Sequence, residues 1–124
     1  MTACPCAQNI MKERAQYVLE DLKVDKETIA KFFEEVPMAT HNQRGRGFLC
    51  IETDDDQDVD LEKIIWILKE SMSAGIYELL KRGDEGAVVL AAHKNPRFVE
   101  DCVREMAKKV LAEFEYLAGD SVVT

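Results

Sequence analysis

Amphipathic helical patterns occupy most of this 124-residue chain and constrain its fold more than any other feature. In residues 8–22, Met11, Ala15, Val18 and Leu22 recur at spacings of three and four, which places them on one helix face. The other predicted helical segments are 25–36 capped by Asp25, 61–73 capped by Asp60, a turn at 76–82, and 95–117 starting at Asn95-Pro96. We therefore predict a chain that is mainly helical.

Only short strands fit between these helices. The strand candidates are residues 48–53, 87–92 and a truncated strand at 121–124, with a turn at 54–58 and Gly83 placed just past a helix. Two strands and a truncated third are too little for a stable sheet, which needs at least three complete strands or extensive packing. The sequence predicts an α+β fold whose small sheet is incomplete, with residues 1–124 forming a single partial unit.

Charge and composition disfavour several classes of function. The formal charge of −8, from 24 acidic and 16 basic residues, disfavours nucleic-acid binding but leaves room for a local basic pocket for one nucleotide. No apolar run reaches about 18 residues and the N-terminal residues do not resemble a signal peptide, so neither a membrane span nor secretion is expected. We expect a cytoplasmic protein whose four cysteines are thiols.

Thiol and imidazole groups are the first candidates for site chemistry. Cys4-Pro5-Cys6 presents two soft ligands two residues apart, a pattern that suits metal binding, redox chemistry or two ordinary thiols. His41 lies in a polar loop, where an imidazole is free to bind a metal or transfer a proton. His93 follows a predicted strand and is interpreted as a surface residue. Cys50 and Cys102 are interpreted as core thiols.

Charged residues supply weaker candidates. Arg44 and Arg46 flank Gly45 beside His41, so their guanidinium groups could hold phosphate, although a basic exposed loop is the commoner outcome. Glu85 in a short loop could reach a metal, and Glu100 at the edge of a helix stripe could hold a ligand. Most such carboxylates are simply solvated.

Four ordered motifs resemble those of the GTP cyclohydrolases that carry a cysteine-proline-cysteine signature. The motifs are Cys4-Pro5-Cys6-Ala7-Gln8, His41-Asn42-Gln43-Arg44-Gly45, Tyr77-Glu78-Leu79-Leu80-Lys81-Arg82-Gly83-Asp84-Glu85 and Asn95-Pro96-Arg97-Phe98-Val99-Glu100-Asp101. The chain is most similar to the archaeal branch that serves methanopterin synthesis, because a helical insertion separates its cysteines from the His-Asn-Gln-Arg loop. The bacterial relatives keep these two motifs closer together.

The resemblance implies a tunnelling fold, in which small antiparallel sheets backed by helices assemble into a barrel. Members of the family carry two such units in tandem, and this chain resembles only the second, without its first and closing strands. The implied partners are GTP and either the missing N-terminal unit or further copies of the chain. The resemblance adds no nucleic-acid or membrane partner.

The resemblance also implies roles for individual residues. The metal ligands would be Cys4 or Cys6, His41 and Glu85. The two cysteines and His41 would also be the catalytic residues. The substrate-binding residues would be Glu100, which anchors the purine, and Asn42, Gln43 and Arg44.

The implied reaction is hydrolytic opening of the guanine imidazole ring of GTP. A metal-bound water attacks C8 and formate leaves, and relatives of the archaeal branch yield a dihydroneopterin cyclic phosphate. Mixed cysteine, histidine and glutamate ligation suits Fe(II), Mn(II) or Zn(II), and the resemblance favours Fe(II). Two alternatives remain open: a non-catalytic metal-binding or oligomerising fragment, and a redox protein that links Cys4 to Cys6 reversibly.

Overall fold

A computed structural model describes residues 1–52 and 58–117. The elements in chain order are β1 Thr2–Ala3, α1 Pro5–Asp21, α2 Lys26–Glu35, β2 Asn42–Gln43, α3 Leu61–Glu70, α4 Arg82–Lys94, α5 Val99–Glu113 and the short 3-10 helix η1 Glu115–Leu117. Helices dominate, and within the described residues β1 and β2 form a single two-stranded antiparallel sheet. The predicted mixture of helices with a small, incomplete sheet is confirmed.

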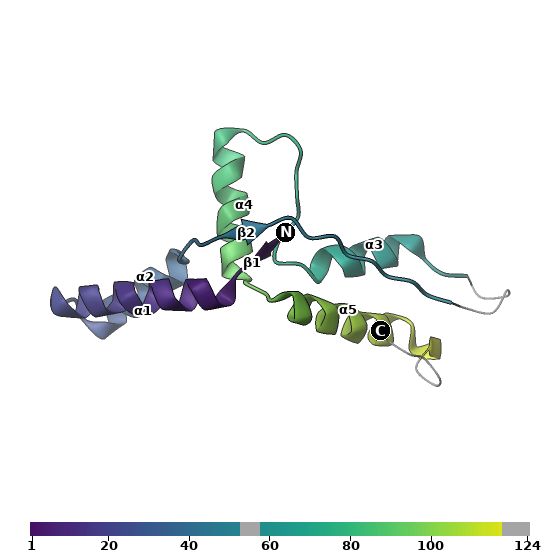
Figure 1. Ribbon diagram of the computed structural model, residues 1–124, viewed down its shortest axis with the longest axis horizontal. Coiled ribbons are helices and arrows are strands. Elements are labelled where there is room, and N and C mark those ends of the chain that lie inside the picture. Colours follow the sequence, from purple (N-terminus) through teal and green to yellow (C-terminus); the bar gives the residue numbers. More distant parts are fainter. Residues whose placement is uncertain (53–57, 118–124) are drawn as a thin grey trace.

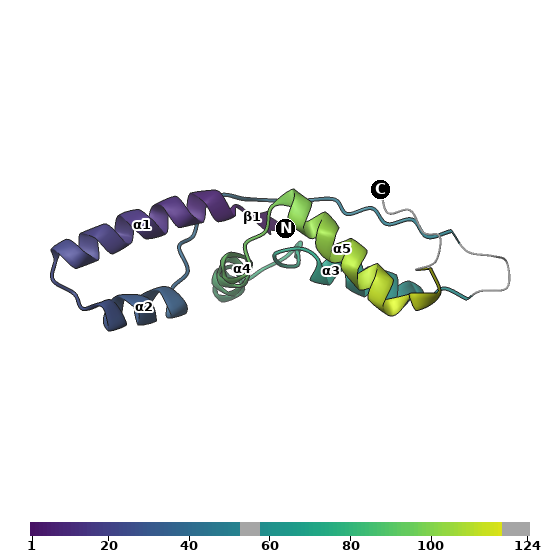
Figure 2. The ribbon, with the colours of Figure 1, turned by 90° about the horizontal axis from the view of Figure 1, so that it is seen from below.

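The molecule is elongated, with its sheet near the centre. Figure 1 shows α1 and α2 as a hairpin on one side of the sheet, α3 and α5 on the other, and α4 standing across the middle. Figure 2, turned by 90°, shows the same order along the long axis. Among the described residues, none of the helices combines the length and apolar character that crossing a membrane requires.

The α1–α2 hairpin follows from local sequence signals. Lys23 adopts a left-handed conformation with φ of 63°, and the amides of Lys23 and Val24 donate to the carbonyls of Glu20 and Leu19, which closes the end of α1. Asp25 then caps α2, because its carboxylate accepts hydrogen bonds from the backbone and hydroxyl of Thr28 at 2.9 and 2.7 Å. The first feature ends α1 before Asp25, and the second confirms the predicted cap at Asp25.

The core lies between α3 and α5. Its buried residues are Ile67, Cys102, Met106, Val110 and Phe114. Asp60 caps α3 as predicted, with its carboxylate 2.9 Å from the amide of Glu62. The helix ends at Glu70 rather than at the predicted Ser73.

The segment predicted as a strand at 48–53 is not one in its described part. Residues 48–52 have no ladder partner among the described residues. They keep an alternation of sides, since Leu49 and Ile51 pack on the core while Phe48 is 88% exposed. Gly47 allows this approach, because a Cβ there would lie 2.9 Å from Cδ2 of Leu68. Strand formation depends on a partner elsewhere, which a local pattern does not reveal.

The strand predicted at 87–92 is wrong, because these residues lie inside α4. A short apolar run does not distinguish a strand from a buried helix segment. The helix begins at Arg82, where the carboxylate of Asp84 accepts a hydrogen bond from the amide of Lys81 at 3.3 Å, so Gly83 lies within the helix rather than past its end.

Four further predicted features differ from the structure or lie outside the described residues. The helical turn predicted at 76–82 is irregular up to Lys81, and α5 begins at Val99 rather than at Asn95-Pro96. The terminal strand at 121–124 lies outside the described residues, as does most of the turn at 54–58.

Candidate functional site

The two short strands bring the cysteine motif beside the His41 loop. Thr2 pairs with Gln43 and Ala3 with Asn42, and the pattern continues by one residue because the amide of Cys4 donates to the carbonyl of His41 at 3.3 Å. Residues directly opposite each other in an antiparallel pair have Cβ atoms about 5 Å apart. Cys4 and His41 are therefore neighbours although 36 residues lie between them in the chain.

The cysteine motif also starts a helix. Cys4 is the N-cap residue of α1 in an extended conformation, and Pro5 occupies the first helical turn, where its missing N–H costs nothing. Cys4 is half-buried and Cys6, in the same first turn, is exposed. Both are free thiols, so both remain available as ligands.

Strand β1 is held by contacts on several sides. Ala3 is only 1% exposed; its amide donates to Oγ of Ser73 at 3.1 Å and its carbonyl accepts from the amide of Arg97 at 3.1 Å. The segment just before α5 therefore lies against β1. Since Cys4 follows Ala3 directly, its backbone position is well defined.

His93 supports the His41 loop from α4. The side chain is buried, with 2% exposure, so its interpretation as a surface residue is wrong. Its Nε2 lies 2.9 Å from the amide of Thr40, and its Nδ1 lies 2.8 Å from the carbonyl of Val89. If residues 82–94 had been interpreted as a helix, His93 would have been expected one turn after Val89. At that position an imidazole can contact the Val89 carbonyl.

Gln8 links the start of α1 to the end of α4. Its side-chain amide donates to the carbonyl of His93 at 2.6 Å. This glutamine belongs to the motif Cys4-Pro5-Cys6-Ala7-Gln8. The motif therefore has an anchoring residue besides its two thiols.

The residues predicted to bind substrate lie at the surface. Asn42 and Gln43 form β2, and their exposed side chains leave them free to reach a ligand, as does that of Arg44 just beyond the strand. Glu100 is also exposed and lies in the first turn of α5. The amide of Arg97, three residues before Glu100, bonds to the carbonyl of Ala3 in β1.

Glu85 does not join Cys4 and His41. It is exposed in the first turn of α4, eight residues before His93. Glu85 and His93 are therefore about 12 Å apart along the helix axis. In residues 1–52 and 58–117 no group of three or more histidine, cysteine, aspartate or glutamate side chains is arranged to hold a metal ion. The chain therefore places two of the predicted ligand positions side by side and leaves the third apart.

The remaining cysteines lie away from the site. Cys102 is buried in the core as expected, and burial raises the pKa of its thiol, an effect that the positive charge of Arg97 partly offsets. Cys50 is exposed, so its interpretation as a core thiol is wrong.

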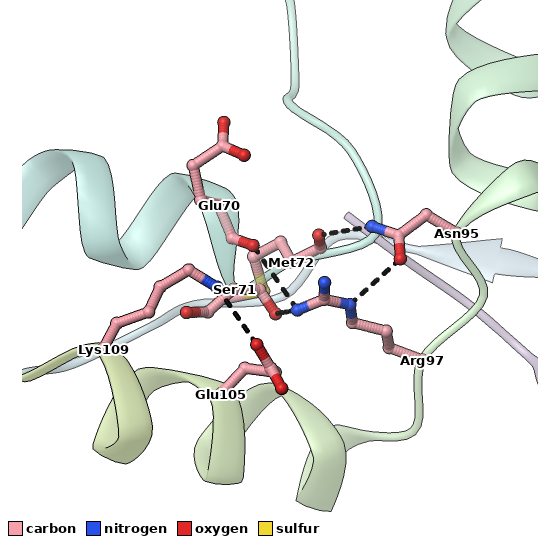
Figure 3. A network of polar contacts seen from close by, with 7 residues as sticks. All are labelled: Glu70, Ser71, Met72, Asn95, Arg97, Glu105 and Lys109. Carbon is pink, nitrogen blue, oxygen red and sulfur yellow. Dashed lines mark hydrogen bonds and ion pairs between the residues drawn. The ribbon is translucent and has the colours of Figure 1, made fainter. Parts of the chain in front are cut away.

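The motif Asn95-Pro96-Arg97 has a structural role that the sequence did not suggest. Figure 3 shows the side chains of Asn95 and Arg97 turned toward the end of α3. Nη1 of Arg97 donates to the carbonyl of Ser71 at 3.0 Å, and Nδ2 of Asn95 donates to that of Ser73 at 3.2 Å. The bond to Ser71 satisfies a carbonyl group at the end of α3, and the bond to Ser73 fixes the loop that follows the helix. They hold α3 against the segment that leads into α5.

Comparison with known proteins identifies similar chains. A family model described as type I GTP cyclohydrolase folE2 matches residues 1–119. The chain is 86% identical over its full length to a protein named GTP cyclohydrolase MptA from Methanoregula boonei, of which it covers 38%. The proteins of the same name from Methanoculleus marisnigri and Methanosarcina barkeri are 76% and 59% identical, with 40% and 39% of their lengths covered. The chain thus spans about two fifths of the curated relatives it matches.

Proposed function

Because the chain belongs to the type I GTP cyclohydrolase family described as folE2, we propose that it is part of a GTP cyclohydrolase and carries a portion of its active site. The enzyme would open the guanine imidazole ring of GTP by hydrolysis and release formate. The proposed product is a dihydroneopterin cyclic phosphate used in methanopterin synthesis, and the proposed compartment is the cytosol, where thiols stay reduced.

The observation that carries this proposal is the pairing of Cys4 with His41. A backbone hydrogen bond of 3.3 Å joins the amide of Cys4 to the carbonyl of His41, so a thiol-bearing and an imidazole-bearing residue are adjacent at the two-stranded sheet. Thiolate and imidazole are ligands that Fe(II) and Zn(II) both accept. Of the two cysteines, Cys4 is the better candidate ligand, because it is the one opposite His41.

The proposed metal is Fe(II), with Mn(II) or Zn(II) as alternatives. Such an ion, when bound, supplies a water molecule of lowered pKa for hydrolysis. The fit within the described residues is partial: the backbones of Cys4 and His41 are paired, but no group of three candidate ligands comes together, whereas catalytic sites usually have about three protein ligands. Completing the site would require a different placement of α4 or a ligand from outside this chain.

The substrate contacts proposed for this chain involve two charged groups. The carboxylate of Glu100 would accept hydrogen bonds from the guanine edge, since a carboxylate can accept two at once. The guanidinium of Arg44, exposed just beyond β2, would pair with phosphate oxygens in a forked geometry. Asn42 and Gln43 would add amide contacts.

The proposed partner is the rest of the polypeptide that the longer relatives possess, or a further copy of this chain. Residues 48–52 are extended and have no ladder partner in the described part of the chain, so their backbone groups could pair with another strand. Large apolar side chains are also uncovered, with Leu79 at 92% exposure. Both features fit an incomplete tunnelling-fold unit.

A second candidate function is a non-catalytic fragment that binds metal or oligomerises. The separation of Glu85 from Cys4 and His41 favours it for the chain alone. The redox alternative would require Cys4 and Cys6 to link reversibly, and it would give His41 no role.

Formate release tests the proposal. The chain and a version extended at both ends to the length of its relatives are incubated anaerobically with GTP and Fe(II), with His41→Ala in each form as the matched control. We expect formate from the extended form, little or none from the chain alone, and none from either His41→Ala variant. No formate from either form would reject the cyclohydrolase proposal. Full turnover by the chain alone would reject the view that its site is incomplete.

A further inference from the structure

His93 is a buried imidazole with both ring nitrogens engaged. Nδ1 lies 2.8 Å from the carbonyl of Val89 on the same helix, and Nε2 lies 2.9 Å from the amide of Thr40 and 3.2 Å from its carbonyl. The side chain is only 2% exposed. Both ring nitrogens therefore have fixed partners, which distinguish the two tautomers of the ring.

The hydrogen bonds favour one neutral tautomer. With the proton on Nδ1, the ring donates to the carbonyl of Val89 and accepts from the amide of Thr40 through Nε2. With the proton on Nε2, the lone pair of Nδ1 would face the Val89 carbonyl, and the Thr40 amide would meet another N–H. An orphaned buried N–H costs free energy, so the first tautomer is the one that fits.

The contact made by His93 leads directly to the candidate site. Thr40 is the residue before His41, and the carbonyl of His41 accepts the amide of Cys4 at 3.3 Å. The hydroxyl of Thr40 lies 3.5 Å from the carbonyl of Cys4. The end of α4, the His41 loop and the start of α1 are thus joined through a short series of hydrogen bonds.

We infer that His93 is a positioning residue: its neutral imidazole, protonated at Nδ1, holds the backbone of Thr40 and His41 against Cys4 and so sets where the His41 side chain stands. The part of this inference that concerns the metal rests on the proposed function. The part that concerns the backbone does not.

Two substitutions separate the two hydrogen bonds of the ring. In His93→Asn the side-chain amide takes the place of Nδ1 and keeps the bond to Val89, but loses Thr40. In His93→Gln the longer side chain places an oxygen near the position of Nε2 and keeps the acceptor for Thr40. Both variants retain a buried polar group, so each is the control for the other.

Hydrogen exchange of individual amides measures the effect without any metal. We expect His93→Asn to speed exchange at Thr40 and Cys4 about tenfold, with amides of α5 unchanged, and His93→Gln to stay within about twofold of the wild type. Unchanged protection of Thr40 in His93→Asn would overturn the inference. An equal loss of amide protection at Thr40 in both variants would also overturn it, because the imidazole would then act only by filling space.

Co(II) titration of the same proteins tests the link to the site. We expect His93→Asn to weaken binding about tenfold and His93→Gln to retain it. Faster amide exchange in His93→Asn with unchanged Co(II) affinity would overturn the proposed role of His93 in positioning His41. No Co(II) binding by the wild-type chain would instead count against the proposed metal site, and the exchange data would still decide the backbone role.

The wild-type chain offers a further check should His93→Asn fail to fold. Nitrogen-15 spectra of the His93 ring at neutral pH distinguish its tautomers. A proton on Nδ1 alone is the expected result. A proton on Nε2 would contradict the inference.

Discussion

Arg97 donates a hydrogen bond of 3.0 Å from Nη1 to the backbone carbonyl of Ser71, the C-cap residue just after α3. The same nitrogen lies 3.4 Å from the carbonyl of Glu70. The backbone amide of Arg97 bonds to Ala3 in the central sheet. One residue therefore ties the α3–α5 layer to the strand that carries the cysteine motif.

Loss of this arginine should destabilise the chain. Arg97→Met keeps much of the side-chain volume but leaves two helix-end carbonyls without their charged donor, so we expect a loss of about 1–2 kcal/mol. Arg104→Met is the matched control, because within residues 1–52 and 58–117 the side chain of Arg104 makes only an exposed ion pair with Asp101, so its loss should cost about 0.5 kcal/mol or less. Urea unfolding measures both. Equal effects of the two substitutions would contradict the capping role of Arg97.

Gly86→Ala should stabilise the chain by about 0.5–1 kcal/mol, because alanine loses less conformational entropy than glycine in a helix. Gly86 lies inside α4, and a Cβ there would meet no atom within 4 Å. Thermal or urea unfolding checks this. A loss of stability would contradict the helical assignment of residues 87–92.

The titration of Cys102 should make stability fall at alkaline pH. Burial raises the pKa of this thiol above its ordinary value of about 8.5. As the pH rises past that value, the unfolded chain loses the thiol proton while the folded chain keeps it, so unfolding becomes more favourable. Urea unfolding midpoints between about pH 8 and pH 10 should decline less steeply in Cys102→Ala than in the wild type. The same slope in both proteins would contradict burial of the thiol.

The chain alone should self-associate. Uncovered apolar side chains such as Phe48, at 88% exposure, and an extended segment without a ladder partner in the described residues favour contact with a second chain. Sedimentation velocity should show species larger than a monomer whose proportion grows with concentration. A monomer with full turnover of GTP would contradict both the association and the incomplete site.

The helices marked by local signals were predictable from sequence. Caps at Asp25 and Asp60 and repeats of apolar residues located α1, α2 and α3 because these signals act within a few residues. The strand predicted at 48–53 was wrong in its described part because strand pairing depends on distant partners. The strand at 87–92 was wrong because an apolar run of that length fits either state.

The site was predictable only in part. Motif resemblance selected His41 and left Cys4 and Cys6 as alternatives; that Cys4 lies opposite His41 depends on the pairing of β1 with β2, which residue spacing does not reveal. His93 was missed because its importance depends on burial against Thr40, a contact between residues far apart in the chain. The roles of Glu85 and Glu100 stay predictions.

The most direct test of the account is Co(II) binding by the wild-type chain, followed through the absorption that thiolate ligation produces. We expect a thiolate-to-cobalt band in the wild type, and affinities at least about tenfold weaker in Cys4→Ser and His41→Ala. Cys50→Ser, which removes an exposed thiol that the account leaves out of the site, should bind like the wild type. Wild-type affinity in both Cys4→Ser and His41→Ala would contradict the claim that these two residues form the metal-binding part of the site.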